Sequence, residues 1–316
     1  MPIELSVIVP IFNEFEIIDE LNERLNKVCS SITNDYEIIY INDGSKDKSL
    51  DKLVELANSN SHCYYINFSR NFGHQIAVTA GIDACRGNSV VIIDGDLQDP
   101  PELIFELYSR HKEGYEVVYA QRRSRSGESI FKKYTAKLFY KILNKITNVE
   151  IPVDTGDFRI IGRKVVEALK QMPEQNKFLR GQIAWIGFKQ TAVLFDRDER
   201  KAGTSGYPFS KMLKFALDGI TGFSERPLAF VTRLGFWVSS FSLVVIIYAL
   251  ISHFMLERTI TGWTSIIIST MFIGGIQLFS IGIIGEYISR INTNTRKRPL
   301  YFIESAHLEN QNISEL

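Results

Sequence analysis

The first part of the chain alternates short apolar runs with longer amphipathic stretches. Runs rich in β-branched and aromatic residues occur at 5–10, 36–43, 63–69, 89–94 and 116–121. Helix-length stretches, such as 48–59 and 100–110, lie between them. Such runs are typical of buried strands, and their alternation with crossovers predicts an α/β fold, with a mostly parallel sheet and helices on both faces.

The pattern changes after residue 225. Asp, Glu, Lys and Arg are absent from 234–256 and from 259–285. As a helix, the first of these runs extends about 35 Å, which exceeds the roughly 30 Å of a bilayer's hydrocarbon core. We therefore predict two transmembrane helices, at about 234–256 and 261–285. Two buried core helices are the alternative, but they would need a further layer of protein around them.

The sequence thus predicts an α/β domain at 1–225, a membrane hairpin at 226–290 and a tail at 291–316. Basic residues flank the hairpin on both outer sides, whereas Arg258 is the only one in its connecting turn. The positive-inside rule then places the α/β domain and both termini in the cytoplasm. We expect an integral protein of the inner or plasma membrane.

Charge and cysteine content limit the classes of partner and the cellular compartment that we expect for this chain. The 316 residues carry a formal net charge of zero, which argues against a nucleic-acid partner. Cys29, Cys63 and Cys85 fit neither a metal site nor a disulfide framework, so we expect reduced, buried thiols in a cytosolic domain. The N-terminus has the pattern of a first strand and not of a secretory signal.

Polar clusters follow the first four predicted strands. They contain Asn13 and Glu14, then Asn42, Asp43 and Ser45, then Ser69, Arg70 and Asn71, and finally Asp94 and Asp96. Because ligands of such sheets lie beyond the carboxyl ends of the strands, these clusters predict one site. Two carboxylates one residue apart suit a hard divalent cation that keeps water and phosphate oxygens as its other ligands.

Three other binding motifs are excluded. An EF-hand beginning at Asp94 would need Gly and Glu where the chain has Asp99 and Phe105. Neither a Walker-type phosphate loop nor a GxGxxG turn after the first strand is present. Calcium sensing, P-loop chemistry and dinucleotide-dependent dehydrogenation are therefore disfavoured.

Six segments in order carry a family resemblance: VIVPIFNE, INDGSKDKS, FSRNFGHQIAVTAGID, DGDLQDPPE, DTGDFRI and RKAGTSGY. Over about residues 3–225 the chain resembles the family 2 glycosyltransferases that act on polyprenyl phosphates, in particular bactoprenol glucosyltransferases and dolichol-phosphate mannosyltransferases. The resemblance implies a GT-A (Rossmann-like) fold. It also implies transfer of a sugar, with inversion, from a nucleotide diphosphate to a lipid phosphate.

The resemblance implies roles for individual residues. Nucleotide-sugar binding falls to Pro10, Phe12, Glu14, Asp43, Asp94, Asp96, Arg122 and Arg200. Asp94, Asp96 and Gln98 would hold Mg²⁺ or Mn²⁺, and a catalytic role falls to Asp157 with Asp94 and Asp96. Arg122, Arg200, Lys201 and Ser205 would meet the acceptor phosphate, with RKAGTSGY as a loop that closes over the donor. Two positions depart from the pattern: Phe12 replaces a common Tyr, and Asn42 replaces a common Asp.

The chemistry of the acceptor limits what Asp157 has to do. A phosphate monoester is already largely ionised at cytosolic pH, so it needs little help from a base. Our hypothesis is that Asp157 orients the acceptor or the sugar at least as much as it removes a proton. His74 and His253 are interpreted as structural residues without a catalytic role.

Two segments suit a membrane surface. Lys133, Lys137, Lys141 and Lys145 recur every four residues in the predicted helix at 128–147, with apolar residues on its other sides. A basic amphipathic helix of this kind is typical of an anionic interface, and 208–222 has a similar pattern. An ordinary solvated helix that packs on the sheet is the alternative.

The resemblance favours an enzyme that moves glucose from UDP-glucose onto undecaprenyl phosphate, which we expect to act at the cytoplasmic membrane face. A GDP-mannose-dependent mannosyltransferase and a non-catalytic, anchored sugar-nucleotide-binding protein stay open as alternatives. A processive polysaccharide synthase is disfavoured because the QxxRW motif is absent. The expected partners are a nucleotide sugar, a polyprenyl phosphate and the membrane, and formation of a homo-oligomer stays open.

Overall fold

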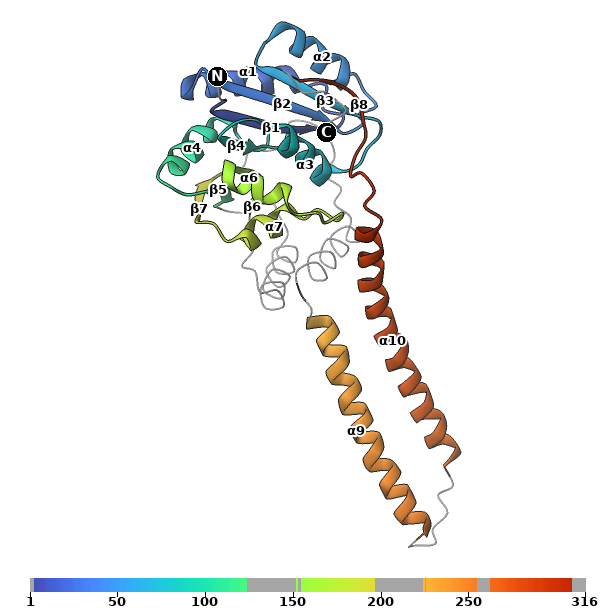
Figure 1. The fold of residues 1–316 in the computed structure, drawn as a ribbon. Helices are drawn as coiled ribbons and strands as arrows, with labels where there is room; N and C mark the ends of the chain where they lie inside the picture. Colours follow the sequence, from blue (N-terminus) through green and yellow to red (C-terminus); the bar gives the residue numbers. More distant parts are fainter. Residues whose placement is uncertain are drawn as a thin grey trace.

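The computed structural model describes residues 3–123, 152, 155–196, 224, 226–254 and 262–308. An α/β domain carries two long helices that extend away from it side by side (Figure 1). The strands are β1 (Leu5–Ile11), β2 (Tyr36–Asn42), β3 (Cys63–Phe68), β4 (Ser89–Ile92), β5 (Val117–Arg122), β6 (Thr155–Gly162), β7 (Gln190–Phe195) and β8 (Ile303–His307). The helices are α1 (Ile18–Ile32), α2 (Ser49–Ser59), α3 (His74–Ala84), η1 (Pro101–Leu103), α4 (Ile104–Lys112), α6 (Arg163–Lys170), α7 (Leu179–Ile186), α9 (Arg226–Phe254) and α10 (Trp263–Thr295).

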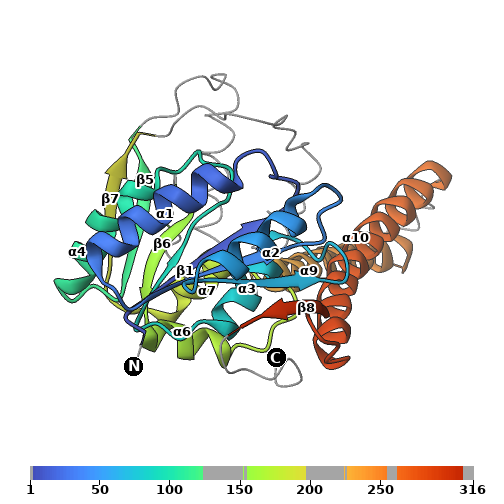
Figure 2. The same ribbon diagram turned by 90° about the horizontal axis from the view of Figure 1, so that it is seen from above.

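The strands form one sheet in the order β7-β5-β6-β4-β1-β2-β3-β8. Strands β1 to β4 are mutually parallel, β6 pairs antiparallel with β4 and β5, and β8 pairs antiparallel with β3. Figure 2 shows β7 and β8 at opposite ends of the sheet. The mostly parallel α/β sheet predicted from the sequence is confirmed, and all five predicted strands are present.

Alternation along each strand divides the core between the two faces of the sheet. On β2, Ile38 and Tyr40 belong to the cluster that contains residues of α1, α2 and α4. Ile39 and Ile41 belong to the other cluster, with residues of α3, α6 and α7. A strand buried on both faces must be apolar at successive positions, which is the pattern of the predicted runs. The three cysteines are buried and unpaired, as expected.

The segment 291–316, expected to be a tail, contains the end of a helix and a strand of the sheet. Helix α10 continues to Thr295, and residues 303–307 then form β8 at the edge of the sheet. The ring of Tyr301, 9% exposed, stacks on Phe68 of β3 with 5.0 Å between ring centroids. This aromatic contact explains why so short a strand stays paired, since it buries apolar area where β8 begins.

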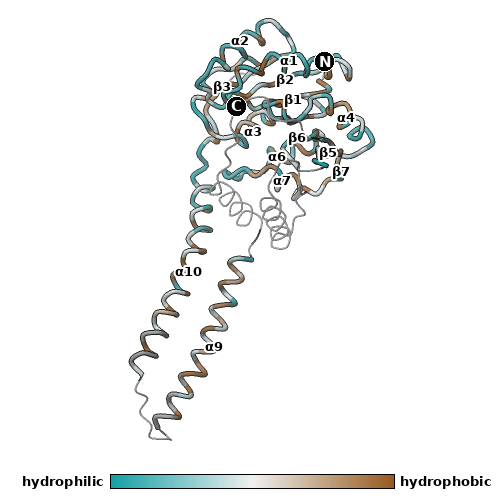
Figure 3. Tube along the Cα trace, turned by 180° about the vertical axis from the view of Figure 1, so that it is seen from behind, coloured by the Kyte–Doolittle hydropathy of each residue, from teal (hydrophilic) through white to brown (hydrophobic). Residues whose placement is uncertain are grey.

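Helices α9 and α10 expose their apolar side chains. Phe236, Trp237 and Phe241 on α9, and Met271 and Leu278 on α10, are all between 68% and 75% exposed. Two stretches are long and apolar enough to cross a membrane, Arg226–Val245 and Ser269–Thr295. Among the described residues, the alternative of two buried core helices is therefore wrong. Figure 3 shows that α10 is more hydrophilic where it meets the α/β domain and apolar beyond.

Candidate active site

The loops after β1 and β2 are tied together at the carboxyl edge of the sheet. Asn13 adopts a left-handed conformation with φ of 56°. Its backbone N–H donates to Ser45 Oγ at 3.0 Å, and its Oδ1 accepts from the Lys46 N–H at 2.8 Å. The Glu14 N–H donates to Ser49 Oγ at 3.2 Å. These hydrogen bonds hold the two loops against each other, because side chains of each loop satisfy backbone N–H groups of the other loop.

The residues expected to bind the nucleotide lie at this edge in different environments. Pro10 is buried within β1, and Glu14 is half-buried. The side chains of Phe12 and Phe15 are 44% and 42% exposed. Exposed aromatic rings beside a polar loop offer a flat apolar surface, which suits the face of a base.

Asp43 holds the loop that follows β3. It is only 3% exposed, and its carboxylate accepts hydrogen bonds from Phe72 N at 2.7 Å, Gly73 N at 3.0 Å and Asn71 Nδ2 at 2.9 Å. Burial raises the pKa of Asp43, although the backbone N–H groups of Phe72 and Gly73 favour its charged form. Both carboxylate oxygens are thus engaged within the protein, whereas the resemblance assigned this group to nucleotide-sugar binding.

Asp157 of β6 is the most firmly held carboxylate of the site. Its side chain is 10% exposed, and Arg180 Nε donates to Oδ1 at 2.7 Å. Gln75 Nε2 donates to Oδ2 at 3.0 Å, and His74 Nε2 lies 3.0 Å from the same oxygen. The contacts come from α3 and α7, so three elements that are distant in sequence converge on one carboxylate.

These contacts keep Asp157 ionised. Burial alone would raise its pKa, but the charge of Arg180 and the hydrogen bond and charge of His74 hold the pKa well below its usual range. The pKa of His74 is raised to about 9: burial opposes the charged form, but Asp94 and Asp157 outweigh it. An ionised carboxylate with such a low pKa is a poor proton acceptor, which agrees with an orienting role.

Asp94, at the end of β4, joins this group. Ligand atoms of His74, Asp94 and Asp157 all lie within 4.8 Å of one another, an arrangement that could hold a metal ion. Asp94 Oδ1 lies 3.4 Å from His74 Nε2, and within the described part of the chain this buried oxygen accepts no hydrogen bond. A buried carboxylate oxygen that accepts no hydrogen bond fits a divalent cation, because such a cation takes carboxylate oxygens as ligands. Burial raises the pKa of Asp94, and the His74 charge opposes that effect.

The other expected metal ligands lie in the turn that follows. Asp96 Oδ1 accepts the backbone N–H of Gln98 at 3.2 Å, and both residues are half-buried. Neither belongs to the three-residue group that the structure brings together. The metal ligand set Asp94, Asp96 and Gln98 therefore stays a prediction, with Asp94 the member shared with the observed cluster.

The structure places His74 inside the site. It lies at the first position of α3 and in contact with two carboxylates of the site, Asp94 and Asp157. Its lack of a catalytic role stays a prediction. The rule that located the other polar clusters would have found it, since His74 follows the end of β3 by a few residues.

Comparison with known proteins shows the family of this chain. The family model for glycosyl transferase family 2 matches residues 6–170. An uncharacterized glycosyltransferase of Bacillus subtilis, YkcC, is 47% identical over 98% of this chain and 97% of its own length. This chain belongs to glycosyl transferase family 2.

Two further relatives cover nearly the whole chain. An uncharacterized glycosyltransferase of Synechocystis, sll0501, is 46% identical over 96% of this chain and 95% of its own. The bactoprenol glucosyl transferase of Shigella phage SfII is 38% identical over 97% of this chain and 99% of its own. Among solved structures, glucosyl-3-phosphoglycerate synthase from Mycobacterium tuberculosis aligns with 69% of this chain and 77% of its own, at 16% identity and a TM-score of 0.47.

In this family 2 chain, Arg122 at the end of β5 lies near the acidic turn. A Cβ atom added to Gly156 would lie 3.8 Å from Arg122 Nη2 and 3.6 Å from Asp99 Oδ2. Gly156 directly precedes Asp157 on β6, so Arg122 lies next to the strand that carries the firmly held carboxylate. The other cationic and hydroxyl residues expected at the phosphates, Arg200, Lys201 and Ser205, lie outside the described residues, as do 128–147 and 208–222.

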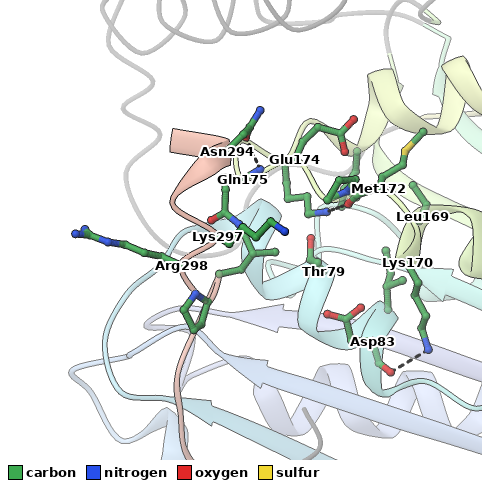
Figure 4. Close-up of a pocket in the computed structure, with 16 residues that line it drawn as sticks. Thr79, Asp83, Leu169, Lys170, Met172, Glu174, Gln175, Asn294, Lys297 and Arg298 are labelled. Atoms are coloured by element: carbon green, nitrogen blue, oxygen red, sulfur yellow. Dashed lines mark hydrogen bonds between the residues drawn. The ribbon is translucent and has the colours of Figure 1, made fainter. Parts of the chain in front are cut away.

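A cavity of about 570 Å³ lies apart from the acidic cluster of this glycosyltransferase (Figure 4). It is an open cavity lined by α3, the end of α6 and the segment between α6 and α7, the first residue of α7, and the end of α10 with the segment after it. Leu179 forms part of its wall, and the Leu179 N–H donates to Gln75 Oε1 at 3.1 Å. The cavity thus shares a wall with the residues that hold Asp157, but none of the three clustered metal-ligating residues lines it.

Proposed function

We propose that this protein is a membrane-anchored, metal-dependent hexosyltransferase that transfers glucose from UDP-glucose onto a polyprenyl phosphate at the cytoplasmic face of the membrane. The reaction joins the anomeric carbon to a phosphate oxygen of the acceptor, with inversion, and releases the nucleoside diphosphate. The product is a polyprenyl-phosphate sugar.

One observation carries the proposal: the similarity to a protein named bactoprenol glucosyl transferase extends over 97% of this chain. It therefore includes both exposed apolar helices as well as the α/β domain. A soluble sugar nucleotide and a lipid phosphate must meet at a membrane surface, and a transferase domain joined to an apolar hairpin suits that task. The described chain begins and ends in the α/β domain, so the hairpin returns to the side it leaves.

The site chemistry supports transfer from a nucleotide diphosphate. Asp94 and Asp96, with Gln98, would hold Mg²⁺ or Mn²⁺, which would neutralise the charge that grows on the departing diphosphate. Asp157 is kept ionised and fixed in position, which suits a group that orients the sugar or the acceptor. We assign nucleotide contacts to the loops of Phe12 and Glu14.

The acceptor phosphate needs positive charge and access from the membrane. We assign its contacts to Arg122 beside Gly156, and to Arg200, Lys201 and Ser205 in the Gly-rich segment. The basic segments 128–147 and 208–222 would lie on the anionic surface and bring the lipid phosphate within reach.

The test is transfer by the purified full chain in detergent. A panel of radiolabelled nucleotide sugars would be supplied with undecaprenyl phosphate and Mg²⁺, Mn²⁺ or EDTA, with Asp94→Asn as the matched inactive variant. We expect label in the lipid phase from UDP-glucose, abolished by EDTA. Label from GDP-mannose alone would replace the proposed donor, and no lipid label from any donor would refute the transferase function.

A further inference from the structure

A chain of side-chain hydrogen bonds connects β8 with the loops at the carboxyl ends of β1 and β2. Asn67 Nδ2 donates to Glu304 Oε2 at 3.1 Å, and Asn42 Nδ2 donates to Asn67 Oδ1 at 2.7 Å. The Ser45 N–H donates to Asn42 Oδ1 at 3.3 Å, and the Asn13 N–H donates to Ser45 Oγ at 3.0 Å. The strand that follows α10 thereby contacts the loops expected to bind the nucleotide.

The bonds have one direction, which the Glu304 carboxylate fixes at one end and the Ser45 N–H at the other. An ionised carboxylate only accepts, so Asn67 turns its NH₂ group toward Glu304 and its oxygen toward Asn42. Asn42 must then turn its own NH₂ group toward Asn67, which leaves its oxygen for the Ser45 N–H. Asn42 and Asn67 are 1% and 3% exposed, so burial keeps water from the bond between these two amides, whereas Glu304 itself is exposed.

We propose that Asn42 and Glu304 are a coupled pair of positioning residues for the donor-binding loops, with Asn67 as the connector between them. The proposal rests on the proposed function and extends it, because it makes the C-terminal strand part of the donor site. Neither side chain needs to touch the nucleotide. They act by fixing the loop that contains Ser45 and, through Ser45 Oγ, the backbone at Asn13.

The pairing explains why position 42 needs an amide and not a carboxylate in this chain. An aspartate at 42 would present an acceptor to Asn67 Oδ1, so the Asn67 amide would have to reverse. Its oxygen would then face Glu304 Oε2, and two acceptors would meet. A lysine at 304 can only donate, so it needs the Asn67 oxygen to face it, which is the reversed orientation of the amide. The Asn67 NH₂ group then faces residue 42, where an aspartate can accept its hydrogen bond.

Reciprocal rescue tests the pair. Asn42→Asp, Glu304→Lys and the double variant would be prepared as full chains in detergent, and UDP and GDP binding with Mn²⁺ would be measured by calorimetry. Glu113→Lys, the same charge change at an exposed position on α4's C-terminal side, is the matched control. Thermal unfolding midpoints would show whether each variant is folded.

We expect each single substitution to weaken binding of the nucleotide about 3- to 10-fold, the range that one net hydrogen bond predicts. The double variant should return to within about 2-fold of wild type, since the reversed amide then satisfies both ends, and Glu113→Lys should change nothing. Should Asn42→Asp fail to fold, recovery of folding in the double variant would support the pair in the same way.

Two results would overturn the proposal. The residues are not coupled if the fold-losses in nucleotide affinity of the two single variants multiply in the double variant. Unchanged binding in folded Glu304→Lys would show that β8 does not position the loops. A wild-type chain that binds neither UDP nor GDP would instead refute the proposed function, and this proposal with it.

Discussion

Replacement of Asp157 by asparagine tests whether this carboxylate is held in place or accepts a proton. The amide has nearly the same shape but only one accepting oxygen. In one orientation its NH₂ group faces Arg180 Nε, and in the other it faces Gln75 Nε2 and His74 Nε2, all within 3.0 Å of the present oxygens. Either way at least one charge-assisted bond is lost, at about 1.5–3 kcal/mol. We therefore expect the rate to fall about 10- to 100-fold.

That loss alone does not separate the two roles, because removal of a general base costs about 10²- to 10⁴-fold. A double-mutant cycle with Arg180→Met does. If Asp157 acts through the geometry that Arg180 imposes, Asp157→Asn should cost less than about 3-fold once Arg180 is gone. A general base would still cost at least about 100-fold in that background.

The assay is the initial rate of sugar transfer into the lipid phase at saturating donor, for wild type, both single variants and the double variant. Arg110→Met, which removes an exposed arginine from α4, is the control. Equal penalties for Asp157→Asn with and without Arg180 would refute the orienting role. Wild-type turnover in Asp157→Asn would refute both roles.

Three further predictions concern the metal, the core and the loops. Asp94→Asn should abolish metal-dependent transfer and weaken Mn²⁺ binding measured directly by calorimetry, whereas unchanged Mn²⁺ affinity would place the metal elsewhere. Arg86→Met should destabilise the α/β domain by on the order of 3 kcal/mol relative to Arg110→Met, because it removes the cation that pairs with Glu37. Glu37 is 1% exposed, so its charge would be left buried without that partner. An unchanged thermal unfolding midpoint would contradict this prediction. Gly44→Ala should impair nucleotide binding far more than Gly114→Ala: both glycines have positive φ, but only a Cβ at Gly44 would meet backbone, at 2.4 Å from the Asn71 N atom. Equal effects would show that strain alone matters.

The sequence predicts the fold well where burial imposes a pattern. Strands covered on both faces must be continuously apolar, and all five such runs are strands in the structure. Edge strands carry no such requirement: β8 has only half-buried or exposed residues and resembles a polar tail in sequence. Strand β6 was not predicted from the sequence, in which only the motif that contains Asp157 was identified.

Prediction of the site was limited by contacts between distant segments. The strand-end rule places Asp94 and Asp43 at the right edge, but hydrogen-bond partners depend on how loops fold back. Asp43 binds the loop at 71–73, and no spacing shows that both its oxygens are used there. Arg180 was not identified because it lies on a short helix that contacts Asp157 of β6 only in the folded chain. The contact of His74 with Asp94 was not foreseen because it arises only when α3 packs on β1 and β2.

The C-terminal segment gives the hairpin a fixed connection to the site. The apolar run of α10 ends at Gly285, but the helix continues for ten residues to Thr295, which adds about 15 Å of polar helix. If the apolar run lies in the bilayer as proposed, this extension sets the distance between the membrane and the α/β domain. The Gln175 N–H donates to Asn294 Oδ1 at 3.1 Å, and β8 then pairs with β3, so the end of α10 is held at two places on that domain. A catalytic edge that must meet both a soluble donor and a lipid phosphate needs a defined height above the membrane, and a helix held by an edge strand provides one where a flexible linker would not.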